Sequence, residues 1–194
     1  FGFFDKTNVG LSGEASGIFH KLDDVSAVEL ATMSFGQRFT ITPLQMITAI
    51  CAIANNGNLL QPKIVKSMTN TDTGEVTNFD TTKIRQVLST QTANQVKSMM
   101  KSVVTDGTGK NAQVQGYSIG GKSGTSEPVV GDTNSGYTTS FAAISPIENT
   151  QVAILVTLYD PQGHSHQGGQ TAAPVVSKIL TEVLPYMGIE PDQK

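Results

Sequence analysis

A short run of residues with one cation and two hydroxyls carries the clearest chemical signal in the sequence. Lys122, Ser123, Gly124 and Thr125 follow one another in a segment that we expect to be a strand. The lysine places a fixed positive charge beside a nucleophile or a substrate carboxylate, and the hydroxyls can hydrogen-bond that carboxylate. Gly124 lacks a side chain, so a second extended backbone can lie close to the strand. The run predicts one wall of an acyl-transfer site that binds a peptide by strand addition.

A second group of residues has the chemistry of a metal site. His164 and His166 stand two positions apart, and Asp160 precedes them in the same segment. In an extended segment two residues at this spacing point to one side, so the imidazoles could share a zinc ion with Asp160 as third ligand. The alternative is a surface loop at the rim of the active site, in which both imidazoles are solvated. Both alternatives stay open.

Four helices are expected to position these segments. Apolar spacing predicts helices over 26–33, over 43–55, over about 91–104 and over about 171–184. Ser26 and Thr42 are the expected N-caps of the first two. The expected inward-facing side chains are Cys51 in the second helix, Val96, Met99, Met100, Val103 and Val104 in the third, and Val175, Val176, Ile179, Leu180 and Val183 in the fourth. Pro185 and Gly188 are expected to end the fourth helix.

Three strands are expected beside the last two helices. They cover 117–126, 137–145 and 151–159, with a turn-rich stretch over 131–136 and a tight connection over 146–149. The short connection favours antiparallel pairing. The nearly continuous apolar run from Gln151 to Leu158 predicts the central strand. Antiparallel strands with helices indicate an α+β layer.

Residues 59–79 are expected to form a smaller antiparallel excursion from the main layer. Ile64, Val65 and Val76 are its strand-like residues, and Asp72-Thr73-Gly74 is the expected turn.

Composition excludes several classes of protein. The 194 residues carry a net charge of −3, which argues against a nucleic-acid footprint. The sequence holds no run of 18 apolar residues that could span a membrane. Its single cysteine excludes an internal disulfide. These features indicate one globular domain.

Several further motifs, in the same order, closely resemble those of class B penicillin-binding proteins, and the resemblance covers essentially the whole chain. The motifs are Val9–Glu14, Thr32–Gln37, Ile41–Met46, Ala52–Gly57, Thr105–Gly109, Lys122–Thr125 and Gly168–Pro174. The resemblance implies the C-terminal part of a penicillin-binding-protein/serine β-lactamase-like transpeptidase fold, with an antiparallel sheet and helices packed on its faces. The stretch over 183–188 looks most like the sporulation-type or septal members.

The resemblance also implies an activity. Members of the family are D,D-transpeptidases that cross-link peptidoglycan stem peptides ending in D-Ala-D-Ala through an acyl-serine, and β-lactams acylate them. No cofactor is required. The implied setting is the extracytoplasmic face of the bacterial membrane, through an anchor outside this chain, beside a glycosyltransferase partner.

The resemblance gives the strand residues their roles. Lys122 is the electrostatic partner of the catalytic serines. Ser123 and Thr125 bind the terminal carboxylate, and the Thr125 backbone N–H supplies half of the oxyanion hole. Gly124 belongs to the same catalytic motif, and Ser126 extends the substrate-binding strand.

The sequence departs from the family pattern at the nucleophile. It contains no Ser-x-Asn, and its one Ser-x-x-Lys is Ser98–Lys101. In the family that motif lies far ahead of the lysine strand and opens a buried helix, so we interpret Ser98 as unrelated to catalysis. We expect residues 1–190 to be the C-terminal portion of one transpeptidase domain, with 191–194 as a tail. Both serine motifs are then expected before Phe1, so the chain alone is expected to be inactive.

Two other functions stay open on the sequence. A degenerate penicillin-binding fold could hold cell-wall peptide or a partner without catalysis, and the missing serine motifs favour it. A β-lactamase-type hydrolase or sensor would share the lysine strand, but the motifs between Thr32 and Gly57 favour the transpeptidase.

Overall fold

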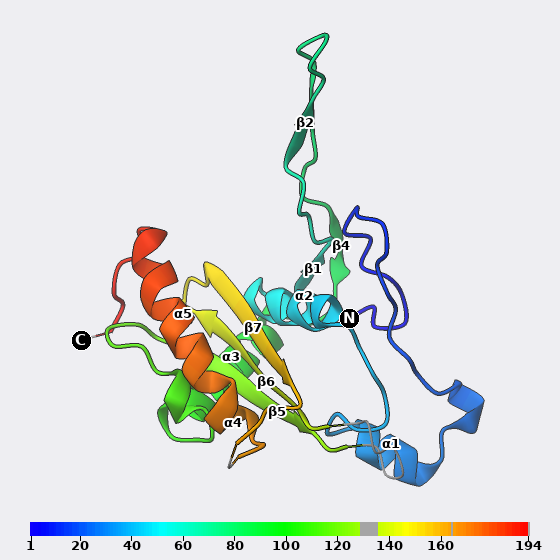
Figure 1. The fold of residues 1–194 in the computed structure, drawn as a ribbon, viewed down its shortest axis with the longest axis vertical. Coiled ribbons are helices and arrows are strands. Elements are labelled where there is room, and N and C mark those ends of the chain that lie inside the picture. The colour runs from blue at the N-terminus through cyan, green and yellow to red at the C-terminus, as the bar shows by residue number, and fades with distance from the viewer. Residues whose placement is uncertain (129–135, 164, 194) are drawn as a thin grey trace. The chain divides into compact units, whose positions relative to one another are not determined.

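The structure is a computed structural model that describes residues 1–128, 136–163 and 165–193. The chain divides into two compact units, the first formed by Phe1–Ala52 and Asn58–Val87, the second by Ile53–Gly57 and Leu88–Lys194. Figure 1 shows the helices and strands of both units along the chain.

The first unit consists of long connecting segments, short helices and two small antiparallel sheets. Its elements are the 3₁₀ helix η1 (Leu22–Asp24), α1 (Ala27–Met33), α2 (Pro43–Ala54), β1 (Asn58–Leu60), β2 (Ser67–Thr69), β3 (Val76–Asn78) and β4 (Lys83–Gln86), and the last two residues of α2 belong to the second unit. Strand β1 pairs with β4, and β2 pairs with β3 in a projecting hairpin (Figure 1).

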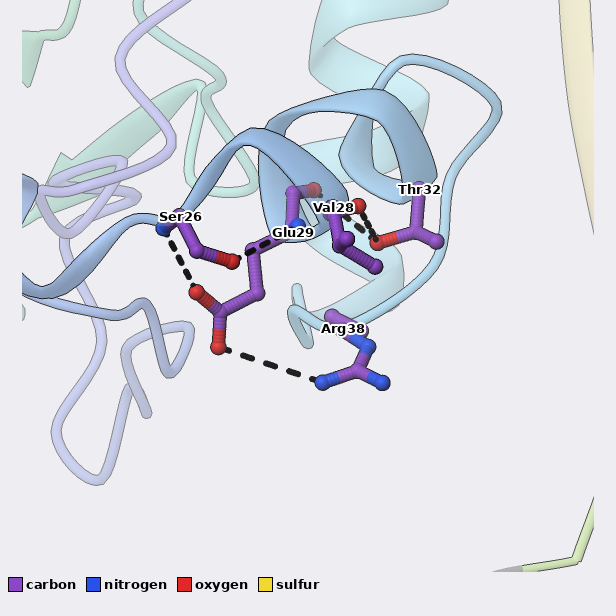
Figure 2. A network of polar contacts seen from close by, with 5 residues as sticks. All are labelled: Ser26, Val28, Glu29, Thr32 and Arg38. Carbon is purple, nitrogen blue, oxygen red and sulfur yellow. Dashed lines mark hydrogen bonds and ion pairs between the residues drawn. The ribbon is translucent and has the colours of Figure 1, made fainter.

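Local hydrogen bonds explain where α1 begins. The Ser26 N–H donates to Glu29 Oε2 at 2.7 Å, and the Glu29 N–H donates back to Ser26 Oγ at 3.3 Å. This reciprocal pair satisfies N–H groups that the first helical turn would otherwise leave without a partner. Figure 2 shows that Arg38 reaches the same carboxylate, with Nη1 3.9 Å from Glu29 Oε1. The predicted N-cap, Ser26, is confirmed.

Helix α2 begins in the same way. The Thr42 N–H donates to Gln45 Oε1 at 2.8 Å, and the Gln45 N–H donates to Thr42 Oγ1 at 3.1 Å. Gln45 is buried, and its amide also donates to the carbonyls of Phe3 and Asp5. The predicted cap is therefore confirmed, but the predicted burial of Cys51 is wrong, because Cys51 is exposed. The apolar spacing of this helix indicated a wider buried face than it has.

A single carboxylate organises the loop that precedes α1. Glu14 accepts hydrogen bonds from the Thr7 N–H and hydroxyl, at 2.5 and 2.6 Å, and longer ones from the N–H groups of Asn8 and Val9. These hydrogen bonds lower the pKa of the Glu14 carboxyl below its ordinary value, and the bond from the Thr7 side chain has the largest effect. Hydrogen bonds to the charged form favour that form.

Replacing Glu14 by glutamine should therefore destabilise the protein at neutral pH and matter less in acid. Because the pKa is lowered in the folded state, the ionised carboxyl stabilises the fold at pH values above its unfolded-state pKa, about 4.3. This stabilisation is lost as the pH falls through the folded-state pKa. Melting temperatures of the two proteins between pH 3 and 7, with Glu75→Gln as an exposed control, measure this. A gap between them that stays constant over the whole range would contradict the prediction.

The smaller sheets differ from the sequence prediction. Residues 64 and 65 lie outside a strand, and β2 begins at Ser67 instead. Strand β4 had no counterpart in the prediction, because its four residues are exposed and alternate between charged and uncharged without an apolar face. Val76 does lie in a strand, as expected, and Gly74 in the predicted turn has a positive φ.

The second unit holds the main sheet. Its elements are α3 (Thr90–Thr105), the 3₁₀ helix η2 (Lys110–Ala112), β5 (Gly120–Ser126), β6 (Thr138–Ser145), β7 (Val152–Tyr159), α4 (Gly168–Thr171) and α5 (Ala173–Tyr186). The strands are antiparallel in the order β5-β6-β7. Helix α3 packs against β5, and α5 packs along β6 and β7 (Figure 1). The predicted α+β layer is confirmed.

The centre of this sheet is β6, and the prediction that residues 151–158 form the central strand is wrong for the three described strands. Nearly all of β6 is buried, whereas β7 is half-buried along its length. Val152, Ile154, Val156 and Leu158 pack against the core, and the alternate residues face the other way. A continuous apolar run therefore indicates that both faces of a strand are apolar, but it does not indicate which strand lies in the middle of the sheet. The predicted turn over 131–136 falls mostly on residues outside the described ranges.

The helices bury narrower stripes than the sequence indicated. Helix α3 buries Ala93, Lys97, Met100 and Val104, while Met99 is 67% exposed. Helix α5 buries Ala173, Val176, Leu180 and Leu184, while Ile179 is exposed. In each helix the buried residues are spaced three to four positions apart and form one stripe along the helix. The predicted inward-facing residues also included side chains from the adjacent stripe, which the structure exposes more. Pro185 lies inside the last turn of α5, so the helix ends one residue later, at Tyr186.

Candidate active site

The Lys122–Thr125 run lies in β5, at one edge of the described sheet. Ser123 is the cross-strand partner of Phe141, and Gly124 that of Ser140, both in β6. Within the described residues, the other edge of β5 has no strand beside it. An edge strand presents unpaired backbone N–H and C=O groups that an extended peptide can join. The edge position leaves β5 able to pair with an extended peptide on that side, and strand addition stays a prediction.

The cation of the run lies along its own strand. Lys122 is exposed, and its Nζ donates to the Ser123 carbonyl at 2.6 Å. An ammonium has three N–H donors, so two remain for other groups. The positive charge is thus held beside the strand edge while keeping capacity for a substrate or a nucleophile.

The hydroxyl of Ser123 meets a second motif of the chain. Thr108 Oγ1 lies 3.4 Å from Ser123 Oγ, and either atom can donate. Thr108 belongs to the turn that follows α3, where the Gly109 N–H donates to the Val103 carbonyl. The structure therefore brings Thr108, which the sequence prediction did not name as a site residue, to Ser123 in β5.

The hydroxyl of Thr125 meets a third motif. The Gly168 N–H, at the start of α4, donates to Thr125 Oγ1 at 3.4 Å. A hydroxyl that accepts this bond still has its own proton, so Thr125 can also donate to a carboxylate. Thr139, the cross-strand partner of Thr125, shares a 2.9 Å hydrogen bond with Thr171 at the other end of α4. Helix α4 is thus attached to the strand pair at both of its ends.

Glycine at position 168 is required by close packing. A Cβ placed there would lie 2.2 Å from the Ser140 carbonyl oxygen and 2.5 Å from that of Gly124. The backbone of α4 therefore lies directly against the β5–β6 pair. The signal for Gly168 and Thr108 was present in the sequence only as the order of the motifs, which does not tell which atoms meet.

The remaining residues named from the sequence divide between the site and its surroundings. Ser126 ends β5 and is exposed, with its Oγ 3.5 Å from the Glu127 carbonyl. Ser98 is exposed on α3, outside the face that this helix buries. Its carbonyl accepts from Ser102 Oγ within the helix. Nothing in these contacts joins Ser98 to β5.

The three residues of the predicted metal site are described only in part. His164 lies outside the described residues. The ring of His166 stacks on that of Tyr137 with 4.2 Å between centroids, and Asp160 accepts from the Gln162 amide. Over residues 1–128, 136–163 and 165–193, no three His, Cys, Asp or Glu side chains form a group that could hold a metal. The zinc site stays a prediction.

The chain that carries these motifs matches a known family. A sequence profile described as penicillin binding protein transpeptidase domain matches residues 1–181. The chain belongs to this family. Stage V sporulation protein D of Bacillus subtilis (strain 168) is 37% identical over 194 residues, which cover 98% of this chain and 30% of that protein. Peptidoglycan D,D-transpeptidase FtsI of Escherichia coli (strain K12) is 33% identical over 195 residues, which cover 99% of this chain and 31% of FtsI.

Solved structures of penicillin-binding proteins share the fold. Penicillin binding protein 3 of Mycobacterium tuberculosis, complexed with ampicillin, matches with a TM-score of 0.87 at 30% identity, over 100% of this chain and 45% of that one. The resemblance to class B penicillin-binding proteins and the transpeptidase fold are thereby confirmed. The chain spans less than a third of the length of the two curated relatives.

Proposed function

We propose that this chain supplies the substrate-binding wall of a serine D,D-transpeptidase. The enzyme would cross-link peptidoglycan stem peptides ending in D-Ala-D-Ala, and β-lactams would acylate it. The observation that carries the proposal is the meeting of three family motifs at β5, an edge strand of the described sheet, where Thr108 contacts Ser123 and Gly168 contacts Thr125. The complex of the related penicillin binding protein 3 with ampicillin supports the β-lactam part.

Each residue of the strand has a chemical part in this proposal. The stem-peptide backbone joins the edge of β5 that has no strand beside it among the described residues. The hydroxyls of Ser123 and Thr125 donate to its terminal carboxylate, and Ser126 extends the strand. Lys122 stabilises the charged groups around the serine, and the Thr125 N–H donates to the oxyanion of the tetrahedral intermediate. These steps need no cofactor.

We further propose that the nucleophilic serine and the Ser-x-Asn motif lie before Phe1 in the complete protein. Large apolar side chains of the first unit are highly exposed: Ile18, Val28, Leu30 and Phe35 are each between 64% and 73% accessible. Exposed apolar surface of this kind is usual where another part of a protein packs. Additional residues of the same domain would cover it and bring the nucleophile to β5.

Fluorescent penicillin tests the proposal directly. We expect covalent labelling of the complete protein, no labelling of the chain 1–194 alone, and full labelling of the complete protein with Ser98→Ala. Labelling that disappears with Ser98→Ala, while the fold is intact, would make Ser98 the nucleophile. A complete protein that binds stem peptide but is never acylated would instead support a non-catalytic binding module.

The cellular setting belongs to the proposal as well. We place the enzyme at the extracytoplasmic face of the membrane, where its substrate lies, beside a glycosyltransferase partner. None of the helices in the described ranges combines the length and the apolarity needed to cross a bilayer.

Zinc at His164, His166 and Asp160 is a separate proposal, independent of acyl transfer. Its support is the spacing of the two histidines in one short segment. Elemental analysis of the purified protein tests it, and a protein without stoichiometric zinc would overturn it.

A further inference from the structure

The segment that follows α5 folds back onto the residues that precede β5. The Tyr117 hydroxyl donates to the Ile189 carbonyl at 2.9 Å, and the N–H groups of Asp192 and Gln193 both donate to the Gly116 carbonyl at 3.0 Å. Ile189 also packs against the hydrophobic core of the second unit. These contacts join positions that are more than 70 residues apart in the chain. The residues after α5 that make them lie beyond the range that the family profile matches, whereas their partners lie within it.

Asp192 makes the closest of these contacts. Its Oδ1 accepts from the Ser118 N–H at 2.6 Å, and its Oδ2 accepts from the Ser118 hydroxyl. One carboxylate thus binds the backbone and the side chain of one residue. Hydrogen bonds to an ionised acceptor are roughly twice as strong as those between neutral groups.

Ser118 connects this segment to the rest of the sheet. It is 3% exposed, and its Oγ accepts from the Ile147 N–H at 2.9 Å. Its carbonyl accepts from the Ser145 hydroxyl at 3.1 Å, and Ser145 is fully buried. The segment after α5, the entry to β5 and the connection from β6 to β7 therefore meet at a single serine.

The position of Ser118 gives this junction a consequence for the site. Ser118 stands two residues before the first residue of β5 and four before Lys122. Because β5 is an edge strand of the described sheet, it has strand pairing on one side only. Its placement then depends more strongly on what holds its ends. Misplacing a catalytic wall by about 1 Å can cost about 100-fold in rate.

We propose that Ile189–Gln193 acts as a latch that fixes the start of β5, with Asp192 as a positioning residue for Lys122–Thr125. Its effect on acylation rests on the proposed function, whereas its effect on β5 does not. Removing the carboxylate leaves the buried N–H and hydroxyl of Ser118 without their acceptor, so β5 loosens at its leading end.

Hydrogen exchange of the complete protein tests the latch without catalysis. Asp192→Ala should speed amide exchange over 119–125 about tenfold, the effect of losing an acceptor for buried donors. Asp192→Asn should recover part of the protection, because its amide oxygen can still accept from the Ser118 N–H. Glu190→Ala, an exposed neighbour, is the matched control and should leave exchange unchanged. Equal protection in Asp192→Ala and the unchanged protein would overturn the latch.

Acylation by penicillin gives the second readout. In Asp192→Ala the acylation rate constant should fall about tenfold while the affinity of the non-covalent complex changes little, and Asp192→Asn should lie between the two. If exchange rises equally in α3 and β5, Asp192 has a general structural role, and the positioning proposal is wrong. If the unchanged protein is not acylated at all, the proposed function fails, and the exchange of β5 still decides on the latch.

Discussion

Replacing Lys122 by alanine should lower the rate of acylation by penicillin about 100- to 1,000-fold in the complete protein, the typical cost of losing one preorganised charge-stabilising group at such a site. The side chain is exposed, and its hydrogen bond is to the Ser123 carbonyl of its own strand. Its loss therefore opens no cavity, and the melting temperature should stay nearly unchanged. Stopped-flow or gel-based labelling with fluorescent penicillin measures the rate.

Lys110→Ala is the matched control for this change. Lys110 is exposed in η2 of the same unit, and its replacement by alanine also removes one positive charge from the protein. It should leave labelling and melting temperature as they are. If Lys122→Ala labels as fast as Lys110→Ala, the lysine does not stabilise the reaction, and its assignment as electrostatic partner of the serine is wrong.

Replacing Gly168 by alanine should have the largest effect on the structure of the site. The new Cβ would lie within 2.5 Å of two carbonyl oxygens, one in β5 and one in β6, so backbone must move. Overpacking of this kind typically costs about 1–3 kcal/mol. We expect a lower melting temperature together with a loss of acylation, because the displaced α4 can no longer donate to Thr125. Thermal unfolding and penicillin labelling of the complete protein measure both.

Gly124→Ala is the comparison variant for Gly168→Ala, because its new Cβ would meet a side chain instead of backbone. The Cβ at position 124 would meet Ser140 Oγ at 2.6 Å, and the next atom stands 3.9 Å away. The serine hydroxyl can rotate to another rotamer, so this variant should be folded and markedly more stable than Gly168→Ala. In the double variant Gly124→Ala with Ser140→Ala, the serine oxygen that the new Cβ would meet is gone. The two changes together should therefore cost less stability than the sum of their separate costs. A Gly168→Ala protein as stable as Gly124→Ala would contradict the close packing of α4.

Much of the local structure could be predicted from residues close together in the sequence. The caps at Ser26 and Thr42 rest on hydrogen bonds that span three residues, so the sequence alone was sufficient for them. The three strands of the main sheet were predicted to within three residues at their starts, and the apolar patterning of β6 and β7 is the reason for those two. Strand order was not, since the apolar run of β7 reflects contact on both faces and β6 occupies the centre.

The site itself shows the same division. The sequence by itself determined that Lys122, Ser123, Gly124 and Thr125 form a strand with the chemistry to bind a carboxylate. Only the tertiary structure decided that this strand lies at a described sheet edge, that Thr108 and Gly168 meet its hydroxyls, and that Asp192 holds its start. Those contacts join residues 15, 43 and 74 positions apart. The physical reason is that such contacts depend on strand register and on the close approach of backbones, which neighbouring residues in the sequence do not encode.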